Sequence, residues 1–151
     1  MGSGTVYKGC LTPSIDIRGT AAAPPAVVWA LLDDSTTWPE WTPIDSCEIE
    51  RPRSEELNEV RRIVNGRVTV REEIVERRPD ERLTYVLIDG LPVTDYRAEI
   101  DLTPAGEGTD IRWHTTFEPN VRGSGWIYRR ALARATKQFV AGLVERAGAD
   151  G

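Results

Sequence analysis

Residues 94–118 read TDYRAEIDLTPAGEGTDIRWHTTFE, and this stretch decides the fold of the chain. Apolar and polar side chains alternate along residues 94–102 and again along residues 110–118. Such an alternation is typical of antiparallel strands that have one buried face and one solvated face. The predicted buried face carries Tyr96, Ala98, Ile100, Leu102, Ile111, Trp113, Thr115 and Phe117.

A long amphipathic helix is predicted after these strands, at about 124–147. An apolar sheet face and an apolar helix stripe of similar length must cover each other. The stripe includes small residues, Ala131, Ala135 and Gly142, whereas the sheet offers large aromatics. We therefore expect the helix to enclose a cavity rather than to fill a core. The stripe recurs at spacings of three and four, through Tyr128, Leu132, Ala135, Phe139 and Leu143.

The earlier part of the chain predicts more strands and two short helices. Proline suits the first turn of a helix, so a short helix is expected from Pro24, and residues 36–41 predict a second helical turn. Asn65-Gly66 between two strand patterns indicates a two-residue hairpin. The prediction is an α+β fold with one seven-stranded antiparallel sheet around the terminal helix. The remaining strands are expected at about 12–19, 46–51, 58–64, 67–78 and 82–89.

Length, charge and cysteine content narrow the class of protein. A chain of 151 residues is long enough for one substantial core and short for two domains. The net charge of −5 argues against broad attraction to nucleic acid or to an anionic membrane. Cys10 and Cys47 do not make a disulfide framework. With no apolar run of roughly 18 residues, we expect a cytoplasmic protein without stable membrane insertion, as a monomer or homodimer.

Four segments together carry a resemblance to a known family. Residues 23–32, 38–41, 90–97 and 108–119 resemble, in order and spacing, the START/Bet v 1-like (SRPBCC) superfamily and its bacterial polyketide cyclase/dehydrase-like branch. The resemblance implies the helix-grip fold: a curved antiparallel sheet around a C-terminal helix, with a ligand cavity between them. It places the domain at 12–147, with an N-terminal extension at 1–11 and a tail at 148–151.

Glu72 is the first candidate for chemistry. In residues 68–74 it shares the parity of the apolar side chains, so an inward face would carry its carboxylate into the cavity. Burial would raise its pKa and fit it for a general acid or base. The resemblance also places a cavity glutamate here in related hormone receptors. The alternatives are an exposed glutamate, or one paired with Arg61 or Arg62.

Tyr96 and Arg61 are the next candidates. Tyr96 has the inward parity of its strand, and the resemblance matches it to a pocket tyrosine that orients a ligand carbonyl. A core tyrosine bonded to backbone is the alternative. Arg61 matches a recurrent arginine of the family, and a buried structural pair with Glu72 is the slightly preferred interpretation.

The resemblance also supplies the rim of the expected cavity. It places Trp38 and Trp41 over one end, where they could close the mouth and stack on a flat ligand. For one of the two, simple anchoring of the short helix to the sheet is the favoured alternative. Leu91, between Gly90 and Pro92, corresponds in position to a gate loop. The full candidate binding set is Trp38, Trp41, Asp45, Arg61, Glu72, Leu91, Tyr96, Trp113, Thr115, Phe139 and Leu143.

The sequence argues against several other kinds of site. His114 is the only histidine, and its strand parity faces solvent, so a metal cluster or a catalytic triad is not expected. No cofactor is predicted either, because the Gly123–Gly125 segment lacks the residues of a phosphate-binding loop. Arg130, Arg134 and Lys137 are interpreted as a solvated helix face rather than as a nucleic-acid site.

Two hypotheses for function remain. The favoured one is a binding module that takes a lipid, an isoprenoid or a polyketide-like aromatic into the cavity, for carriage or sensing. The alternative is a polyketide cyclase/aromatase-type enzyme that catalyses aldol closure and dehydration, with Glu72 and Tyr96 as catalytic residues. Asp45 and the arginines are the only other groups available for proton transfer. The arginine, tyrosine and serine set of the dedicated cyclases cannot be placed here residue by residue.

Overall fold

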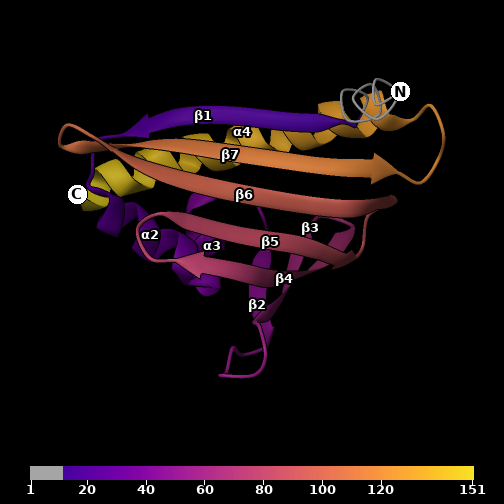
Figure 1. Cartoon of the computed structure of the whole chain (residues 1–151), viewed down its shortest axis with the longest axis horizontal. Helices are drawn as coiled ribbons and strands as arrows, with labels where there is room; N and C mark the ends of the chain where they lie inside the picture. Colours follow the sequence, from indigo (N-terminus) through magenta and orange to yellow (C-terminus); the bar gives the residue numbers. More distant parts are fainter. Residues whose placement is uncertain (1–11) are drawn as a thin grey trace, which may run out of the picture.

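The structure is a computed structural model that describes residues 12–151, and it shows one curved antiparallel sheet with a long helix behind it (Figure 1). The strands lie in the order β1-β7-β6-β5-β4-β3-β2, which confirms the predicted seven-stranded helix-grip-like fold. The strands are β1 (Ser14–Ala21), β2 (Ser46–Arg51), β3 (Val60–Asn65), β4 (Val68–Arg78), β5 (Arg82–Asp89), β6 (Val93–Ala105) and β7 (Gly108–Pro119). The helices are α2 (Pro25–Asp33), the 3-10 turn η1 (Ser35–Thr37), α3 (Trp38–Trp41) and α4 (Gly125–Asp150).

The element boundaries differ from the expected ones most clearly in α4, in β3 and in the β6–β7 pair, and β1 is Ser14–Ala21 rather than about 12–19. Helix α4 continues to Asp150, so most of the expected tail is helical. Strand β3 begins at Val60 rather than near residue 58, because the Arg51 side chain donates two hydrogen bonds to the Asn58 carbonyl oxygen and holds it in the loop. Strands β6 and β7 stay paired as far as Ala105↔Gly108 and are therefore longer than expected.

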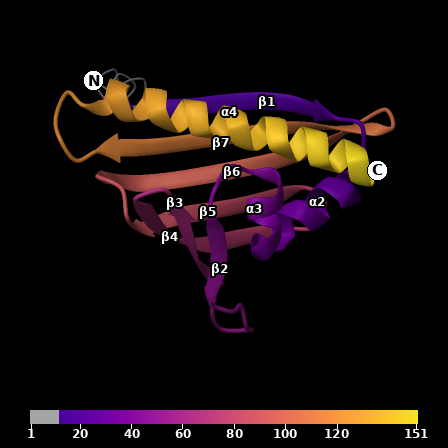
Figure 2. The same ribbon diagram turned by 180° about the vertical axis from the view of Figure 1, so that it is seen from behind.

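The two ends of the chain come together in the sheet. Strand β1 pairs antiparallel with β7, from Ser14↔Thr116 to Ala21↔Thr109. Helix α4 then lies along β1 and β7 on the concave side, and α2 and α3 contact it as well (Figure 2). The interior between α4 and the rest of the sheet is left to side chains, and this is where the cavity forms.

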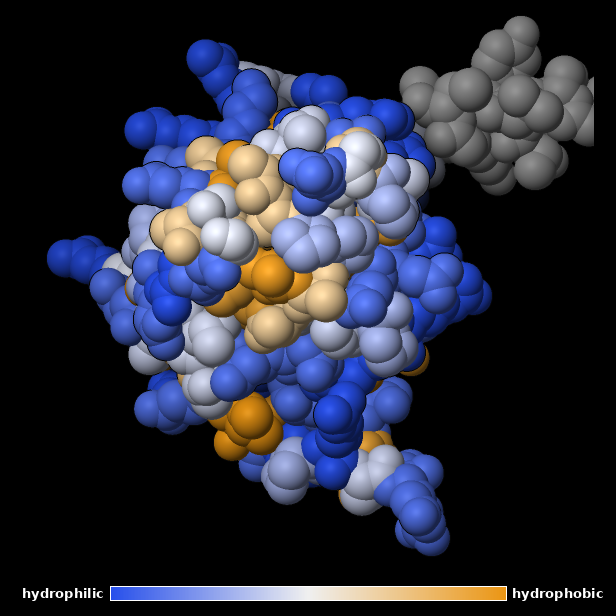
Figure 3. Space-filling model, turned by 90° about the vertical axis from the view of Figure 1, so that its left-hand side faces the viewer, coloured by the Kyte–Doolittle hydropathy of each residue, from blue (hydrophilic) through white to orange (hydrophobic). Residues whose placement is uncertain are grey.

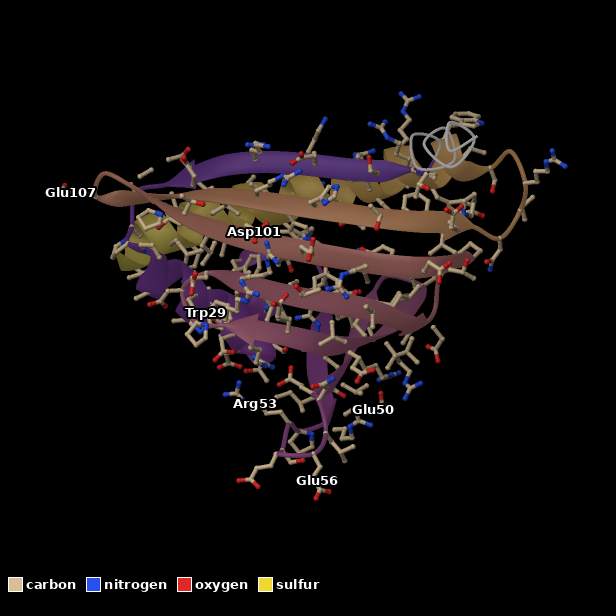
Figure 4. The ribbon with its side chains drawn as sticks, in the orientation of Figure 1. Trp29, Glu50, Arg53, Glu56, Asp101 and Glu107 are labelled. Atoms are coloured by element: carbon tan, nitrogen blue, oxygen red, sulfur yellow. The ribbon has the colours of Figure 1, made fainter. Side chains whose placement is uncertain are left out.

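The outer face of the sheet is covered by charged side chains (Figure 4). Arg82 Nε donates to Asp101 at 2.6 Å, and Arg112 Nη2 donates to Asp16 at 2.9 Å. Exposed pairs of this kind contribute at most about 1 kcal/mol each. This face is therefore a solvated surface and not a second layer of the core.

A second polar network fixes the short helices to the sheet. The Ser35 hydroxyl donates to Glu59 Oε2 at 2.5 Å, and Arg77 Nη2 donates to Glu59 Oε1 at 3.0 Å. Arg77 also binds Asp33 at the end of α2. Because Glu59 lies beside β3 and Arg77 lies on β4, the network holds η1, and with it α3, over the concave side.

Helix α4 approaches α3 very closely at one point. A Cβ atom built on Gly142 would lie 1.7 Å from the Trp41 carbonyl oxygen. No side chain can occupy that space, so glycine is required for the two helices to touch. The contact seats Trp41 and its neighbour Trp38 against the interior.

Helix α2 and the C-terminus lie at one end of the molecule (Figure 1). Seen from that end, the surface has apolar side chains at its centre and hydrophilic side chains around them (Figure 3). Among the helices of the described residues, none has the length and apolar character needed to cross a membrane.

Cys47 is buried and free, and burial raises the pKa of its thiol to about 11, which makes it unreactive. Cys10 and the expected extension at 1–11 lie outside the described residues.

Candidate functional site

A cavity of about 120 Å³ lies between the sheet and helix α4. Its mouth is at the end of the sheet where the β3–β4 turn and the β5–β6 loop lie, since Asn65, Val68 and Leu91 belong to its wall. Helix α4 closes the other side with Leu132, Ala135 and Phe139. The remaining wall residues are Trp38, Ile44, Ile63, Val70, Glu72, Tyr85 and Tyr96.

A buried ion pair forms the polar end of this cavity. Arg61 Nε donates to Glu72 Oε1 at 3.0 Å, and Arg61 Nη2 lies 2.9 Å from the same oxygen. The pairing follows from the register, because Arg61 and Glu72 lie opposite each other on β3 and β4. Arg61 is fully buried, and Glu72 is 6% exposed. Within residues 12–151, no donor is hydrogen-bonded to Glu72 Oε2.

Aromatic rings compensate the charge of Arg61. Its guanidinium carbon lies 3.9 Å from the ring centroid of Trp38 and 4.7 Å from that of Tyr85. Neither Arg61 Nη1 nor Arg61 Nη2 has a hydrogen-bond partner in the described part of the chain, although Nη2 lies close to Glu72 Oε1. Cation–π contacts of a desolvated arginine are worth about 2 kcal/mol. The rings therefore hold the guanidinium in place behind Glu72, where water does not reach it.

Burial sets the protonation of the groups at this end. It raises the pKa of the Glu72 carboxyl above its ordinary value of 4.5, although the charge and hydrogen bond of Arg61 oppose the rise. Burial would lower the pKa of Arg61, but the Glu72 carboxylate raises it further, so the guanidinium stays charged. Burial also raises the pKa of the Tyr85 and Tyr96 hydroxyls, and both remain protonated.

The structure brings five of the candidate residues to the cavity wall and leaves the others elsewhere. Those on the wall are Trp38, Glu72, Leu91, Tyr96 and Phe139. Arg61 lies behind Glu72, and Asp45 is exposed, where it accepts a hydrogen bond from the Gly66 backbone N–H at 2.7 Å. Trp113, Thr115 and Leu143 are buried but do not line the cavity. Trp41 packs on Trp38 with ring centroids 4.9 Å apart.

Tyr85, like Asn65, is a polar wall residue that was not among the candidates predicted from the sequence. It accepts a hydrogen bond from Trp113 Nε1 at 3.3 Å, and its ring centroid lies 6.4 Å from that of Tyr96. The signal was present, because Leu83, Tyr85 and Leu87 share one parity in β5. The hydroxyls of Tyr85 and Tyr96 and the Glu72 carboxylate are the polar side chains at the deep end of the cavity.

Comparison with known families gives a match over nearly all of the described chain. The family described as polyketide cyclase / dehydrase and lipid transport matches residues 12–148. No curated protein sequence matches the chain.

Solved structures of the same fold are numerous, and all three named here are distant in sequence. A START superfamily protein from Mycobacterium smegmatis has a TM-score of 0.78 at 15% identity, over 91% of this chain and 99% of its own. TTHA0849 from Thermus thermophilus has a TM-score of 0.74 at 22% identity, over 92% of this chain and 99% of its own. The di-domain aromatase/cyclase StfQ of the steffimycin pathway has a TM-score of 0.76 at 18% identity, over 95% of this chain and 54% of its own. At these identities the similarity shows the fold alone.

Proposed function

The chain belongs to the polyketide cyclase / dehydrase and lipid transport family, and we propose that its cavity binds a small apolar molecule carrying a hydrogen-bond donor. One observation carries the proposal: an apolar cavity ends at Glu72, whose Oε1 is held by Arg61 while Oε2 has no donor among the described residues. A hydrogen bond to a charged acceptor contributes about 1.5–3 kcal/mol. A ligand hydroxyl or N–H directed at Oε2 would form such a bond.

The size of the cavity narrows the ligand class. A volume of about 120 Å³ is below the roughly 300–1,000 Å³ of most sites for drug-sized ligands. A cavity of roughly 150 Å³ takes up a single benzene ring. The deep end therefore suits one ring with a hydroxyl, such as a phenol. The rest of a larger lipid, isoprenoid or polyketide-like aromatic would extend through the mouth, where Val68 is 44% exposed.

Filling the cavity should weaken ligand binding by about 5- to 150-fold. Ala135 lies on the cavity wall, so Ala135→Phe places a ring in the ligand's space. A ligand must then share the filled space with this ring, and forcing extra atoms into a packed interior costs about 1–3 kcal/mol, which corresponds to about a 5- to 150-fold loss of affinity. The measurement is a fluorescence titration with 2-naphthol. Ala141→Phe is the matched control, because Ala141 is exposed on the same helix and its variant should bind as the wild type does. Equal affinity of the two variants would place the ligand outside the cavity.

Glu72 should determine the preference for a donor. The test compares 2-naphthol with 2-methylnaphthalene, which has the same shape but no hydroxyl. In the wild type the hydroxyl should be favoured, and Glu72→Gln should reduce that preference by about 1–3 kcal/mol. Binding of 2-methylnaphthalene should persist in the variant and serves as the control for an intact cavity. An unchanged preference would remove Glu72 from the recognition of the ligand.

A second candidate function is catalysis of aldol cyclisation and dehydration. It is favoured by one observation, the raised pKa of the Glu72 carboxyl on the same cavity wall as Tyr96. Under this hypothesis Glu72→Gln lowers turnover of a poly-keto substrate by about 10²-fold or more while the substrate still binds. Native mass spectrometry of freshly purified protein would identify the class of molecule that stays bound.

A further inference from the structure

The basic residues of the chain are distributed unevenly. Between Pro119 and Val144 there are five, Arg122, Arg129, Arg130, Arg134 and Lys137, and no acidic residue. The rest of the chain holds the other 14 basic residues and all 24 acidic ones. A protein with a net charge of −5 thus has one strongly positive segment, which covers the β7–α4 loop and most of α4.

These five cations also lack ion-pair partners. Within residues 12–151, none of the five forms an ion pair. Most arginines of the sheet behave differently, and Arg71, Arg82 and Arg112, for example, are each paired with carboxylates. Of the five, only Arg129 forms a side-chain hydrogen bond within the described residues: its Nε donates to the Ser14 carbonyl oxygen at 2.9 Å. The positive segment is consequently not neutralised by the acidic remainder of the protein.

The cations share a helix face with exposed apolar residues. Trp126, Arg130 and Arg134 follow one another at spacings of four, and Lys137 comes three residues later, which places all four on one outward stripe. Trp126 is 66% exposed, the highest fraction among the exposed large hydrophobic residues of the described chain. Ile127 beside it is 49% exposed, and Val121 in the preceding loop is 60% exposed. Because all three side chains are exposed, packing in the core does not account for their apolar character.

The stripe lies close to the mouth of the cavity. The N-terminal half of α4 lies at the end of the sheet where the β3–β4 turn and the β5–β6 loop are also found (Figure 2). Leu132, one turn after Tyr128 on the inner side of the same helix segment, is part of the cavity wall. Any surface that contacts the outer stripe is therefore near the opening through which a ligand must pass.

From these observations we propose that the stripe formed by Val121, Trp126, Ile127, Arg130, Arg134 and Lys137 binds the surface of an anionic phospholipid bilayer. Tryptophan prefers the membrane–water interface, and arginine and lysine are attracted to anionic headgroups. An amphipathic helix with cations beside exposed Trp and Ile has the pattern of an interfacial helix. Nucleic acid is the less favoured partner, because the three large apolar side chains at the N-terminal end of the stripe would gain nothing from a phosphate backbone. The proposal does not depend on which ligand the cavity holds.

The first test measures binding of the whole protein to vesicles by co-sedimentation. Vesicles of equal parts phosphatidylglycerol and phosphatidylcholine should bind the protein, and pure phosphatidylcholine vesicles should bind it far more weakly. Arg130→Gln/Arg134→Gln should lower the partition coefficient by about 20- to 30-fold. Salt at about 0.5 M should weaken the wild type in the same direction, because it screens the charges.

Matched variants separate the stripe from net charge and general hydrophobicity. Arg18→Gln/Arg62→Gln removes two exposed arginines from the sheet, so its charge change is identical, and it should bind vesicles like the wild type. Trp126→Ser should weaken binding about tenfold, whereas Leu57→Ser, at a residue 50% exposed on the β2–β3 loop, should not. All four variants should keep the wild-type affinity for 2-naphthol, which tests the cavity independently.

Three results would overturn the proposal. One is equal binding to neutral and anionic vesicles. Another is an equal loss for the stripe variant and the sheet variant. The third is tight, stripe-dependent binding to a DNA duplex with no binding to anionic vesicles, which would assign the stripe to nucleic acid.

Discussion

Arg61→Met should lower the free energy of unfolding by about 3–5 kcal/mol, the cost of breaking a buried ion pair on one side. Methionine keeps much of the apolar volume between Trp38 and Tyr85 but removes the Nε donor to Glu72 Oε1 and the positive charge beside it. The carboxylate is then left in the interior with no cation beside it. Urea unfolding followed by circular dichroism at pH 7 measures the difference.

The loss should shrink as the pH is lowered. Arg61 opposes the rise in the Glu72 pKa, so its removal lets burial raise that pKa further. A carboxyl whose pKa is higher in the folded state contributes stability that is present below the unfolded value and is lost as pH rises through the folded value. The difference between variant and wild type should therefore be smaller at pH 5 than at pH 8.

A second substitution provides the control for the ion pair. In Arg61→Met/Glu72→Leu both charges are gone, and apolar replacements of buried pairs are often neutral or stabilising. The double variant should regain most of the stability lost by Arg61→Met. If Arg61→Met unfolds at the same urea concentration as the wild type, the pair is not the buried contact described above.

Gly142→Ala should destabilise the protein by about 3 kcal/mol or more, at the upper end of what overpacking costs. The added methyl group would overlap the Trp41 carbonyl oxygen, which is backbone and cannot rotate away. Helix α4 must then move off α3, and the contact that seats Trp38 on the cavity is lost. Thermal and urea unfolding report the stability, and 2-naphthol titration reports the cavity.

Gly148→Ala is the matched control for this prediction. Gly148 lies further along α4, and a Cβ atom built there meets nothing within 4 Å. Alanine favours a helix over glycine by about 0.5–1 kcal/mol, so this variant should be slightly more stable than the wild type. The same substitution should thus have opposite signs at two positions of one helix. Similar effects at both would contradict the close approach of α3 and α4.

The sequence predicted the fold and the partnership of Arg61 with Glu72, because both depend on alternation. The parity of residues 68–74 placed Glu72 inward, whereas a turn at Asn65-Gly66 would have set Arg61 opposite Val70. The turn is at Gly66-Arg67 instead, so Asn65 pairs with Val68 and Arg61 lies opposite Glu72. Periodicity identifies the face on which a side chain lies. It contains no information on how tightly two elements approach each other across the interior.

That limit explains where the candidate site could not be predicted. Tyr96 and Trp113 have the same inward parity, yet only Tyr96 reaches the cavity. Phe139 and Leu143 are likewise one turn apart on the helix stripe, and only Phe139 reaches it. The difference arises because α3 and α4 converge at Gly142, so the interior is closed beside Leu143 and open beside Phe139. Such convergence is a property of the assembled layers and is not encoded in any single element.

The pairing of β1 with β7 also constrains the order in which the protein can fold. Ser14 and Thr116 are partners in the sheet although most of the chain separates them. On the ribosome, β1 emerges before the other strands and has no partner until β7 has been synthesised, and α4, which lies over both, emerges after β7. Contacts between residues so distant in sequence slow folding, because the loop must close before they are formed. The nascent chain therefore carries β1 as an unpaired strand until β7 is available to close this edge of the sheet.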